Sequence, residues 1–227
     1  MPNVKNNAAA QETRRKLIDA AGAVFAERGL HAATTKEITK RAGVNGAAIN
    51  YHFRDKFELY AAVIRHALSI TPVAQSARVL TGRPEDRLRA HVEELIDDLY
   101  SPSRPAWRAT LLAHEFVQPT AALDGVMEEL IRPRANLVHD IVRGILGPKA
   151  SEEQVLRAAM SIGAQCFMYL YQSEVVRRLH PQLVRDENPG KVVEHIVEFS
   201  LAALRGMRRR RKVSRPRSRR AAAALPR

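Results

Sequence analysis

Residues 34–53, which read TTKEITKRAGVNGAAINYHF, constrain the fold of this chain most strongly. Thr34 and Glu37 have the spacing of a capping box, in which the threonine hydroxyl accepts from a free backbone N–H and the glutamate bonds back. Gly43 then ends a first short helix, and Asn45 can cap a second one. Two short helices joined by a three- or four-residue turn that contains glycine describe a helix-turn-helix.

The rest of the chain follows the same helical period. Leu17, Ala21 and Val24 recur every three or four residues and give one apolar face, after which Gly29 stops the helix. Pro and Gly separate the periodic segments, and no alternating β-branched run is long enough for a strand. We therefore expect an all-α fold, with further helices over residues 11–28, 55–79, 84–99, 106–117, 119–146 (kinked at Pro133), 151–179 and 188–207.

This organisation predicts two domains and a tail. Residues 11–71 form an N-terminal three-helix helix-turn-helix domain, residues 72–207 a larger C-terminal helical domain, and residues 208–227 a disordered tail. The net charge is +13, and the tail holds ten Lys or Arg and no acidic residue. Basic ends favour a polyanionic partner such as nucleic acid, although a basic tail can also act only to keep a chain in solution.

Several classes of function are disfavoured by composition and motifs. The single cysteine, Cys166, excludes an intramolecular disulfide and a cysteine-built zinc site, and its apolar surroundings in the sequence indicate inert packing. No apolar run reaches 18 residues, and the eight histidines lack metal-ligand spacing. The motifs G-x-S-x-G, G-x-x-x-x-G-K-[ST] and H-E-x-x-H are absent. We therefore expect a cytoplasmic chain with no metal, no cofactor, no membrane partner and no catalytic residues.

The helix-turn-helix offers several kinds of contact with DNA, because the second helix of such a unit enters the major groove. Gly46 and the two alanines after it are small, so they permit close approach to bases and thymine methyl groups. The first helix begins beside Thr35, where free N–H groups and the helix dipole favour a phosphate. Phe53 is interpreted as a core anchor. The candidate DNA-contacting residues are Thr34, Thr35, Lys36, Gly46, Ala47, Ala48, Asn50, Tyr51, His52 and Lys56.

Four motifs occur together in residues 13–60: TT-x-E-I, AGV, AINYHF and DKFELY. In this combination they resemble the N-terminal domain of the TetR family of bacterial transcriptional regulators. More weakly, the body is similar to the CecR (YbiH-like) subgroup, which shares a segment like EFVQPTA at residues 115–121 and a helix with an internal proline like Pro133.

The resemblance implies an all-α homodimer whose C-terminal domain binds a small molecule and dimerises. It also implies a repressor that leaves a palindromic double-stranded DNA operator when that molecule binds. By the family's pattern, Tyr51, His52 and Lys56 contact phosphates. Asn50 and Lys36 then remain as direct readers of bases, with DNA shape supplying the rest.

Polar residues within the apolar body are candidates for a ligand site. In the helix expected over residues 151–179, Arg157, Ser161 and Gln165 lie four apart and in line with Tyr169. Such a narrow stripe indicates burial on nearly all sides, and the resemblance places this helix at both the ligand cavity and the dimer axis. The alternative is that the stripe faces water at the edge of the bundle.

Arg134 lies on an apolar stripe, and a buried charge needs a partner. It either pairs with a carboxylate such as Glu115 or contacts an anionic or polar ligand. Cavities for small molecules favour aromatic walls with a few polar groups. The candidate ligand-binding residues are Trp107, His114, Met127, Arg134, Gln165 and Tyr169.

The last helix carries a small apolar face suited to the dimer axis, formed by Val193, Ile196, Val197, Ser200 and Leu204. Two other classes of function compete with a ligand-responsive repressor. An enzyme would need one of the motifs that the chain lacks, and a DNA-binding protein without an effector would not need a helical body as large as residues 72–207. A transcriptional activator of the same fold stays open, as do the effector and the operator.

Overall fold

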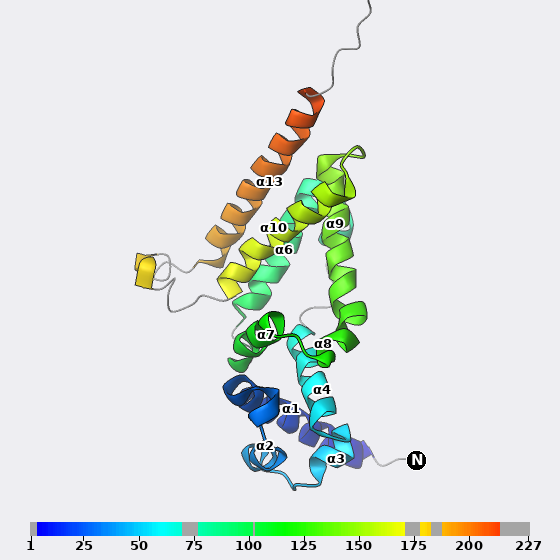
Figure 1. The fold of residues 1–227 in the computed structure, drawn as a ribbon, viewed down its shortest axis with the longest axis vertical. Helices are drawn as coiled ribbons and strands as arrows, with labels where there is room; N and C mark the ends of the chain where they lie inside the picture. The colour runs from blue at the N-terminus through cyan, green and yellow to red at the C-terminus, as the bar shows by residue number, and fades with distance from the viewer. Residues whose placement is uncertain (1–3, 70–76, 102, 171–177, 183–187, 214–227) are drawn as a thin grey trace, which may run out of the picture.

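The computed structural model describes residues 4–69, 77–101, 103–170, 178–182 and 188–213, and every regular element in these ranges is helical (Figure 1). This confirms the all-α prediction. The helices are α1 (Val4–Ala32), α2 (Thr35–Ala42), α3 (Ala48–Phe53), α4 (Lys56–Leu68), α5 (Ala77–Leu80), α6 (Pro84–Leu99), α7 (Trp107–Val117), α8 (Ala121–Val126), the π-helix η1 (Met127–Ile131), α9 (Arg132–Leu146), α10 (Glu152–Leu170) and α13 (Pro189–Val213).

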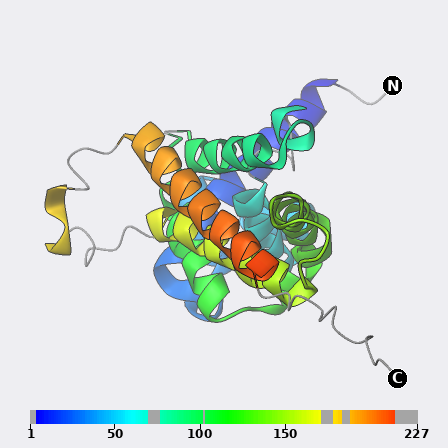
Figure 2. The same ribbon diagram turned by 90° about the horizontal axis from the view of Figure 1, so that it is seen from above.

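The molecule is elongated, with α1–α4 at one end and α6, α9, α10 and α13 toward the other (Figure 1). Helices α7 and α8 lie between these two groups. Seen from above, α13 crosses over α10, with which it is in contact (Figure 2). None of the described helices is long and apolar enough to cross a membrane.

The start and end signals of the short helices act largely as predicted. The Thr34 hydroxyl accepts from the Glu37 N–H at 3.2 Å, and Gly43 takes a left-handed conformation (φ 66°, ψ 34°) after α2. Glu37 does not bond back to Thr34, because its carboxylate pairs with Arg28 at 2.9 Å. Only half of this capping box is therefore formed. At α10 the box is complete, since Ser151 and Gln154 bond each other's backbone N–H at 3.2 Å.

Helix α4 is shorter than predicted. The sequence period predicted one helix from Asp55 to Val79, but α4 ends at Leu68, and Val79 belongs to the separate helix α5. Residues 70–76 lie outside the described part of the chain. The signal that we underestimated is Pro72, because proline disfavours helical geometry at the residue before it and cannot donate to a helical carbonyl.

The predicted helix over residues 119–146 is divided into three parts instead of being kinked once. It begins at Ala121, where Thr120 caps α8 by accepting from the Ala122 N–H at 3.2 Å. A π-helical turn, η1, then precedes α9. Pro133 has no N–H for the carbonyl four residues before it, so the wider π turn comes where the regular ladder would lose a bond.

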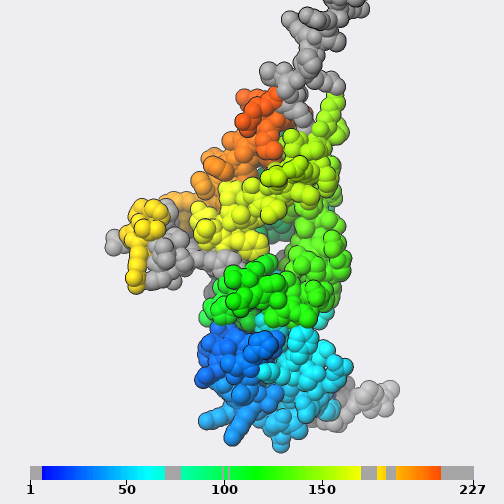
Figure 3. Space-filling view, viewed as in Figure 1, coloured from blue at the N-terminus to red at the C-terminus, as the bar shows by residue number. Residues whose placement is uncertain are grey.

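Two apolar clusters form the core, and their division does not follow the predicted boundary at residue 71. The first cluster unites α1–α4 with residues of α7 and α8, among them Leu111, Leu112 and Val126. The second is built by α5, α6, α9, α10 and α13. The space-filling view shows α7 and α8, in green, seated on the blue and cyan helices (Figure 3). Helices α7 and α8 thus pack with the helix-turn-helix, although they belong to the C-terminal part of the sequence.

The expectation that the chain becomes disordered from residue 208 is wrong for its first part. Helix α13 continues to Val213, and the Arg208 guanidinium donates to the Ile145 carbonyl at 3.2 Å. Arginine has a high helix propensity, so a basic run can extend a helix that is already anchored. Residues 214–227 lie outside the described part.

Candidate functional site

Helices α2 and α3 are locked together by the turn between them. The Val44 N–H donates to the Thr39 carbonyl at 3.1 Å, and the Asn45 side chain accepts from the Ala47 N–H at 2.8 Å. Asn45 was predicted to cap the second helix, but it closes the turn before α3, which begins at Ala48. Buried Ile49 and Phe53 anchor α3 in the first cluster, which confirms Phe53 as a core residue.

The opposite face of α3 and the turn before it point outward. Gly46, Ala47 and Asn50 are exposed, and Tyr51 is 81% exposed, so the tyrosine is not part of the core. Ala48 and His52 are half-buried at the edge of the same face. Thr34, Thr35 and Lys36 are also exposed, at the start of α2.

Nothing in the structure of the single chain requires a glycine at position 46. A Cβ atom added there would meet nothing within 4 Å, and its backbone does not lie in the left-handed region that favours glycine. The packing of this chain therefore does not explain a glycine at position 46. A surface that must approach DNA closely would explain it.

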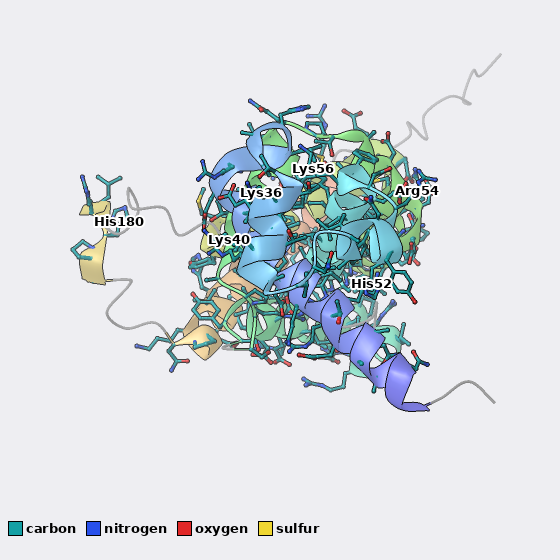
Figure 4. The ribbon with its side chains drawn as sticks, turned by 90° about the horizontal axis from the view of Figure 1, so that it is seen from below. Lys36, Lys40, His52, Arg54, Lys56 and His180 are labelled. Carbon is teal, nitrogen blue, oxygen red and sulfur yellow. The ribbon has the colours of Figure 1, made fainter. Side chains whose placement is uncertain are left out.

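Basic side chains lie around this face (Figure 4). Lys36 and Lys40 project from one side of α2, His52 lies on α3, Arg54 follows α3, and Lys56 begins α4. Our sequence interpretation missed Lys40 and Arg54. The signal for Lys40 was its position four residues after Lys36, which places both on one helical face. Arg54 is 80% exposed at its side chain and takes a left-handed φ of 72°, unusual for a residue with a Cβ.

Lys56 has a structural role that its sequence position did not reveal. Its ammonium donates to the carbonyls of Ala33 at 2.9 Å and His31 at 3.2 Å, near the end of α1. An ammonium has three N–H donors, so one remains for a phosphate. Lys56 therefore fastens the start of α4 to the end of α1 as well as adding charge.

The six candidate ligand-binding residues do not come together in one place. Trp107 packs on α1, where a Cβ on Gly22 would lie 2.3 Å from its ring, and His114 is exposed. Met127 is half-buried in η1, and Tyr169 packs on the second cluster. Trp107 thus joins α7 to the helix-turn-helix, whereas Tyr169 belongs to the other apolar cluster.

The polar stripe of α10 splits into two environments. Arg157 and Ser161 are exposed, so this part of the stripe faces water, as the alternative interpretation held. Gln165 is half-buried and donates to Ser161 O at 3.2 Å and to the Ser200 hydroxyl of α13 at 3.3 Å. The prediction of burial on nearly all sides is wrong for α10 in this single chain.

The predicted pairing of Arg134 with Glu115 does not occur. The Arg134 guanidinium donates to the Leu68 carbonyl at 2.9 Å, at the last residue of α4. Glu115 is buried and accepts from the Tyr60 hydroxyl at 2.5 Å and from Thr120, through its backbone N–H at 2.7 Å and its hydroxyl at 2.9 Å. The sequence predicted a buried charge at Arg134, which is half-buried, and did not predict the burial of Glu115. Periodicity cannot say which helices face each other.

Three further charged residues near Arg134 were missed. Asp98 is buried and pairs with Arg104 and with the buried Arg108, whose Nη2 lies 3.1 Å from Asp98 Oδ2. The signal was available for Arg108, which shares an apolar stripe of α7 with Leu111 and Glu115.

The apolar face proposed for the dimer axis is wrong. Val193, Ile196, Val197, Ser200 and Leu204 are all buried within their own chain. The large apolar side chains that α10 and α13 expose most are instead Met160 (73% exposed), Met168 (61%) and Phe199 (60%), and α10 also exposes Leu156 and Phe167 to a smaller extent. Two faces of α13 are apolar, and the period alone did not show which of them the chain itself covers.

Cys166 is buried, and burial raises the pKa of its thiol to about 12, so the thiol stays protonated. Among the described residues, no group of three His, Cys, Asp or Glu side chains is placed to hold a metal ion.

Two family models match the chain. The model of the bacterial regulatory proteins of the tetR family matches residues 17–63. The model of the C-terminal domain of the HTH-type transcriptional dual regulator CecR matches residues 84–204, more than half of the chain.

Individual proteins match in the same regions. The chain is 42% identical over 87 residues to the HTH-type transcriptional activator FasR of Mycolicibacterium smegmatis, which covers 38% of this chain and 40% of FasR. It is 30% identical over 164 residues to the dual regulator CecR of Shigella flexneri, covering 64% of this chain and 70% of CecR. The chain therefore spans less than half the length of FasR.

Among solved structures, AibR in complex with isovaleryl coenzyme A and operator DNA has a similar fold. Its TM-score is 0.62 at 14% identity, and the match covers 82% of this chain and 97% of AibR.

Proposed function

Because the chain belongs to the TetR family of bacterial transcriptional regulators and carries a CecR-type C-terminal domain, we propose that it is a homodimeric repressor that a small-molecule effector releases from a palindromic operator. It is a DNA-binding transcriptional regulator, and the family assignment confirms the expectation that it is not an enzyme. As a bacterial DNA-binding regulator it would act in the cytoplasm.

The helix-turn-helix face carries the proposal. Exposed Asn50 lies on α3 and the unexplained Gly46 in the turn before it, so in chain order they fall between Lys36 and Lys40 of α2 and Arg54 and Lys56 after α3. This arrangement supports base reading at the centre and phosphate contacts at the rim. We propose that Thr34, Thr35, Lys36, Gly46, Ala47, Ala48, Asn50, Tyr51, His52 and Lys56 contact DNA, with Lys40 and Arg54 added to the rim.

Exposed apolar side chains on α10 and α13 support the dimer. Met160, Met168 and Phe199 would be covered if both helices packed against their two-fold copies in a four-helix interface. Such a dimer would present two α3 helices to a palindromic site. The effector would be a small, partly apolar molecule held among α6, α9 and α10, and the isovaleryl coenzyme A of AibR makes an acyl thioester one candidate.

The direction of regulation needs its own experiment. FasR is named as an activator and CecR as a dual regulator, so an activator is the second candidate. We would select bound fragments from genomic DNA and transcribe the bound promoters in vitro with and without the protein. Repression requires a lower transcript yield with the protein present, and a higher yield would assign the chain as an activator.

Replacing Asn50 by alanine should cost about 1–3 kcal/mol of operator binding and relax the sequence preference, because a base-reading amide would be lost. Lys40→Ala should weaken specific and random DNA about equally and lower the salt slope by about one unit, since it would remove one phosphate contact. Fluorescence anisotropy over a salt series measures both. Arg83→Ala, at an exposed arginine just before α6, serves as the control. If Asn50→Ala weakened random DNA as much as the operator, Asn50 would be a phosphate contact.

A further inference from the structure

A charged layer joins the two apolar clusters. Asp98 lies on α6, a helix of the second cluster. It pairs with Arg104 and with Arg108, and Arg108 lies on α7, which packs with the first cluster. Arg134 of α9 reaches across in the same way, donating to the last carbonyl of α4. The contact between the two groups of helices is therefore polar at this point, and three arginines take part in it.

Three arginine side chains gather around Asp98 in this layer. Among the described residues, Asp98 is the one carboxylate whose charge acts on the pKa of both Arg108 and Arg134, and burial lowers the pKa of each arginine. Burial, with the charge of Arg134, also lowers the pKa of neighbouring His91 to about 4, so His91 is neutral at physiological pH. One carboxylate thus faces three guanidinium groups.

The pairing of Asp98 with Arg108 is also incomplete. Asp98 Oδ2 and Arg108 Nη2 lie 3.1 Å apart, yet both atoms are buried without a properly aligned hydrogen-bond partner. A buried guanidinium N–H that lacks a partner costs free energy, which an added acceptor would recover. An anion is the ligand that would satisfy both the excess charge and the unused donor.

The same arginines hold the end of α4. Arg108 Nε donates to the Ala67 carbonyl at 2.6 Å, and Arg134 donates to that of Leu68 at 2.9 Å. Cations at a helix C-terminus stabilise it through the free carbonyls and the helix dipole. At its other end α4 follows α3 directly, and Lys56 fastens it to α1. Helix α4 thus connects Arg108 and Arg134 to the DNA-binding face.

We propose that Arg104, Arg108 and Arg134 bind the anionic head, such as a carboxylate, of a small molecule with an apolar body, and that this anion competes with the α4 carbonyls for the guanidinium groups. The proposal rests on the effector release proposed above and names the chemical class of the effector. Half-buried Leu137 and Val138 follow Arg134 along α9 and offer apolar contacts. The surface is hollowed where α7, α9 and α10 meet (Figure 3).

Competition is expected because a carboxylate accepts stronger hydrogen bonds from a guanidinium than a neutral carbonyl does. An arginine turned toward the anion leaves the end of α4 less stabilised, so the ligand-bound state favours a different position of α4. Coupling of about 1–3 kcal/mol is typical between such sites and corresponds to about 5- to 150-fold weaker operator binding.

The test uses decanoate as the probe, below its micelle concentration, and methyl decanoate as the uncharged match. Each is titrated against the full chain, with thermal unfolding reporting binding and anisotropy of labelled operator reporting release. Arg134→Gln should bind decanoate about 10- to 100-fold more weakly, since charged hydrogen bonds are lost. Asp98→Asn removes the competing carboxylate and should bind it roughly tenfold more tightly. Arg83→Gln, at an exposed arginine just before α6, is the control.

The inference is supported if decanoate raises the melting temperature and releases operator, if the methyl ester does neither, and if the two variants move in opposite directions. Equal effects of acid and ester, or an unchanged response in Arg134→Gln, would overturn it. Circular dichroism checks that each variant is folded, and Asp98→Asn keeps the test decisive if Arg134→Gln unfolds. The same titration measures operator binding before decanoate is added. A chain that bound no operator at that point would count against the proposed function and not against this inference.

Discussion

A chain with glutamate in place of Phe199 is expected to sediment as a monomer and to bind its operator about 100- to 10,000-fold more weakly than the parent chain, because the two half-sites would no longer be bound as one unit. Phe199 is 60% exposed within its own chain, so the substitution leaves the core intact. In the proposed dimer, the two carboxylates would be brought together and desolvated across the axis. Sedimentation velocity and anisotropy measure the two effects.

Val117→Glu is the matched control, since Val117 is 78% exposed at the end of α7, which is not one of the two helices of the proposed interface. It should remain dimeric and bind DNA normally. Ile196→Arg gives the contrasting result, because Ile196 is buried in the single chain and a charge there should unfold the protein. A dimer that survived Phe199→Glu would mean that α13 is not at its interface.

Replacing Glu115 by alanine should lower the free energy of unfolding by about 2–5 kcal/mol, because it leaves the buried donors of Tyr60 and Thr120 without an acceptor. Burial and the Glu115 carboxylate both raise the pKa of Tyr60, so its hydroxyl stays protonated and needs that acceptor. Chemical denaturation followed by circular dichroism measures the loss.

Glu115→Gln is the matched variant for this prediction. Its amide keeps an acceptor oxygen close to the donors of Thr120, so its loss of stability should be clearly smaller than that of Glu115→Ala. A loss below about 1 kcal/mol for Glu115→Ala would show that water replaces the carboxylate and that this site is not sealed.

Local signals gave most of the fold. The glycine turn at Gly43 and the capping residues Thr34 and Ser151 act within a few residues of themselves, so the sequence shows them directly. The end of α4 was misplaced because our interpretation followed the apolar period to Val79 and did not take Pro72 into account. Such a helix end is decided both by the apolar periodicity, which favours a longer helix, and by proline, which disfavours it. Periodicity alone does not show which of the two prevails.

Partners across the fold could not be predicted in the same way. The sequence marked Arg134 as a charge on an apolar face and offered Glu115 as its partner, but each is bonded to a different residue of α4. Which carbonyl or hydroxyl each one meets depends on the packing angle of helices that are far apart in the chain. The apolar face of α13 was misassigned for a related reason, since an intrachain core and a dimer interface favour the same residue types.

The π-helical turn η1 lies between two packing units, inside the C-terminal part of the sequence. Leu130 and Ile131 of η1 pack with the first apolar cluster, whereas Ile141 and Ile145 of α9 belong to the second. In amide hydrogen exchange, α7 and α8 should therefore be protected together with α1–α4, and α9 with α6, α10 and α13. The hinge between the part that holds DNA and the part that responds to an effector would then lie at residues 127–131, rather than at the boundary that the sequence families draw between residues 63 and 84.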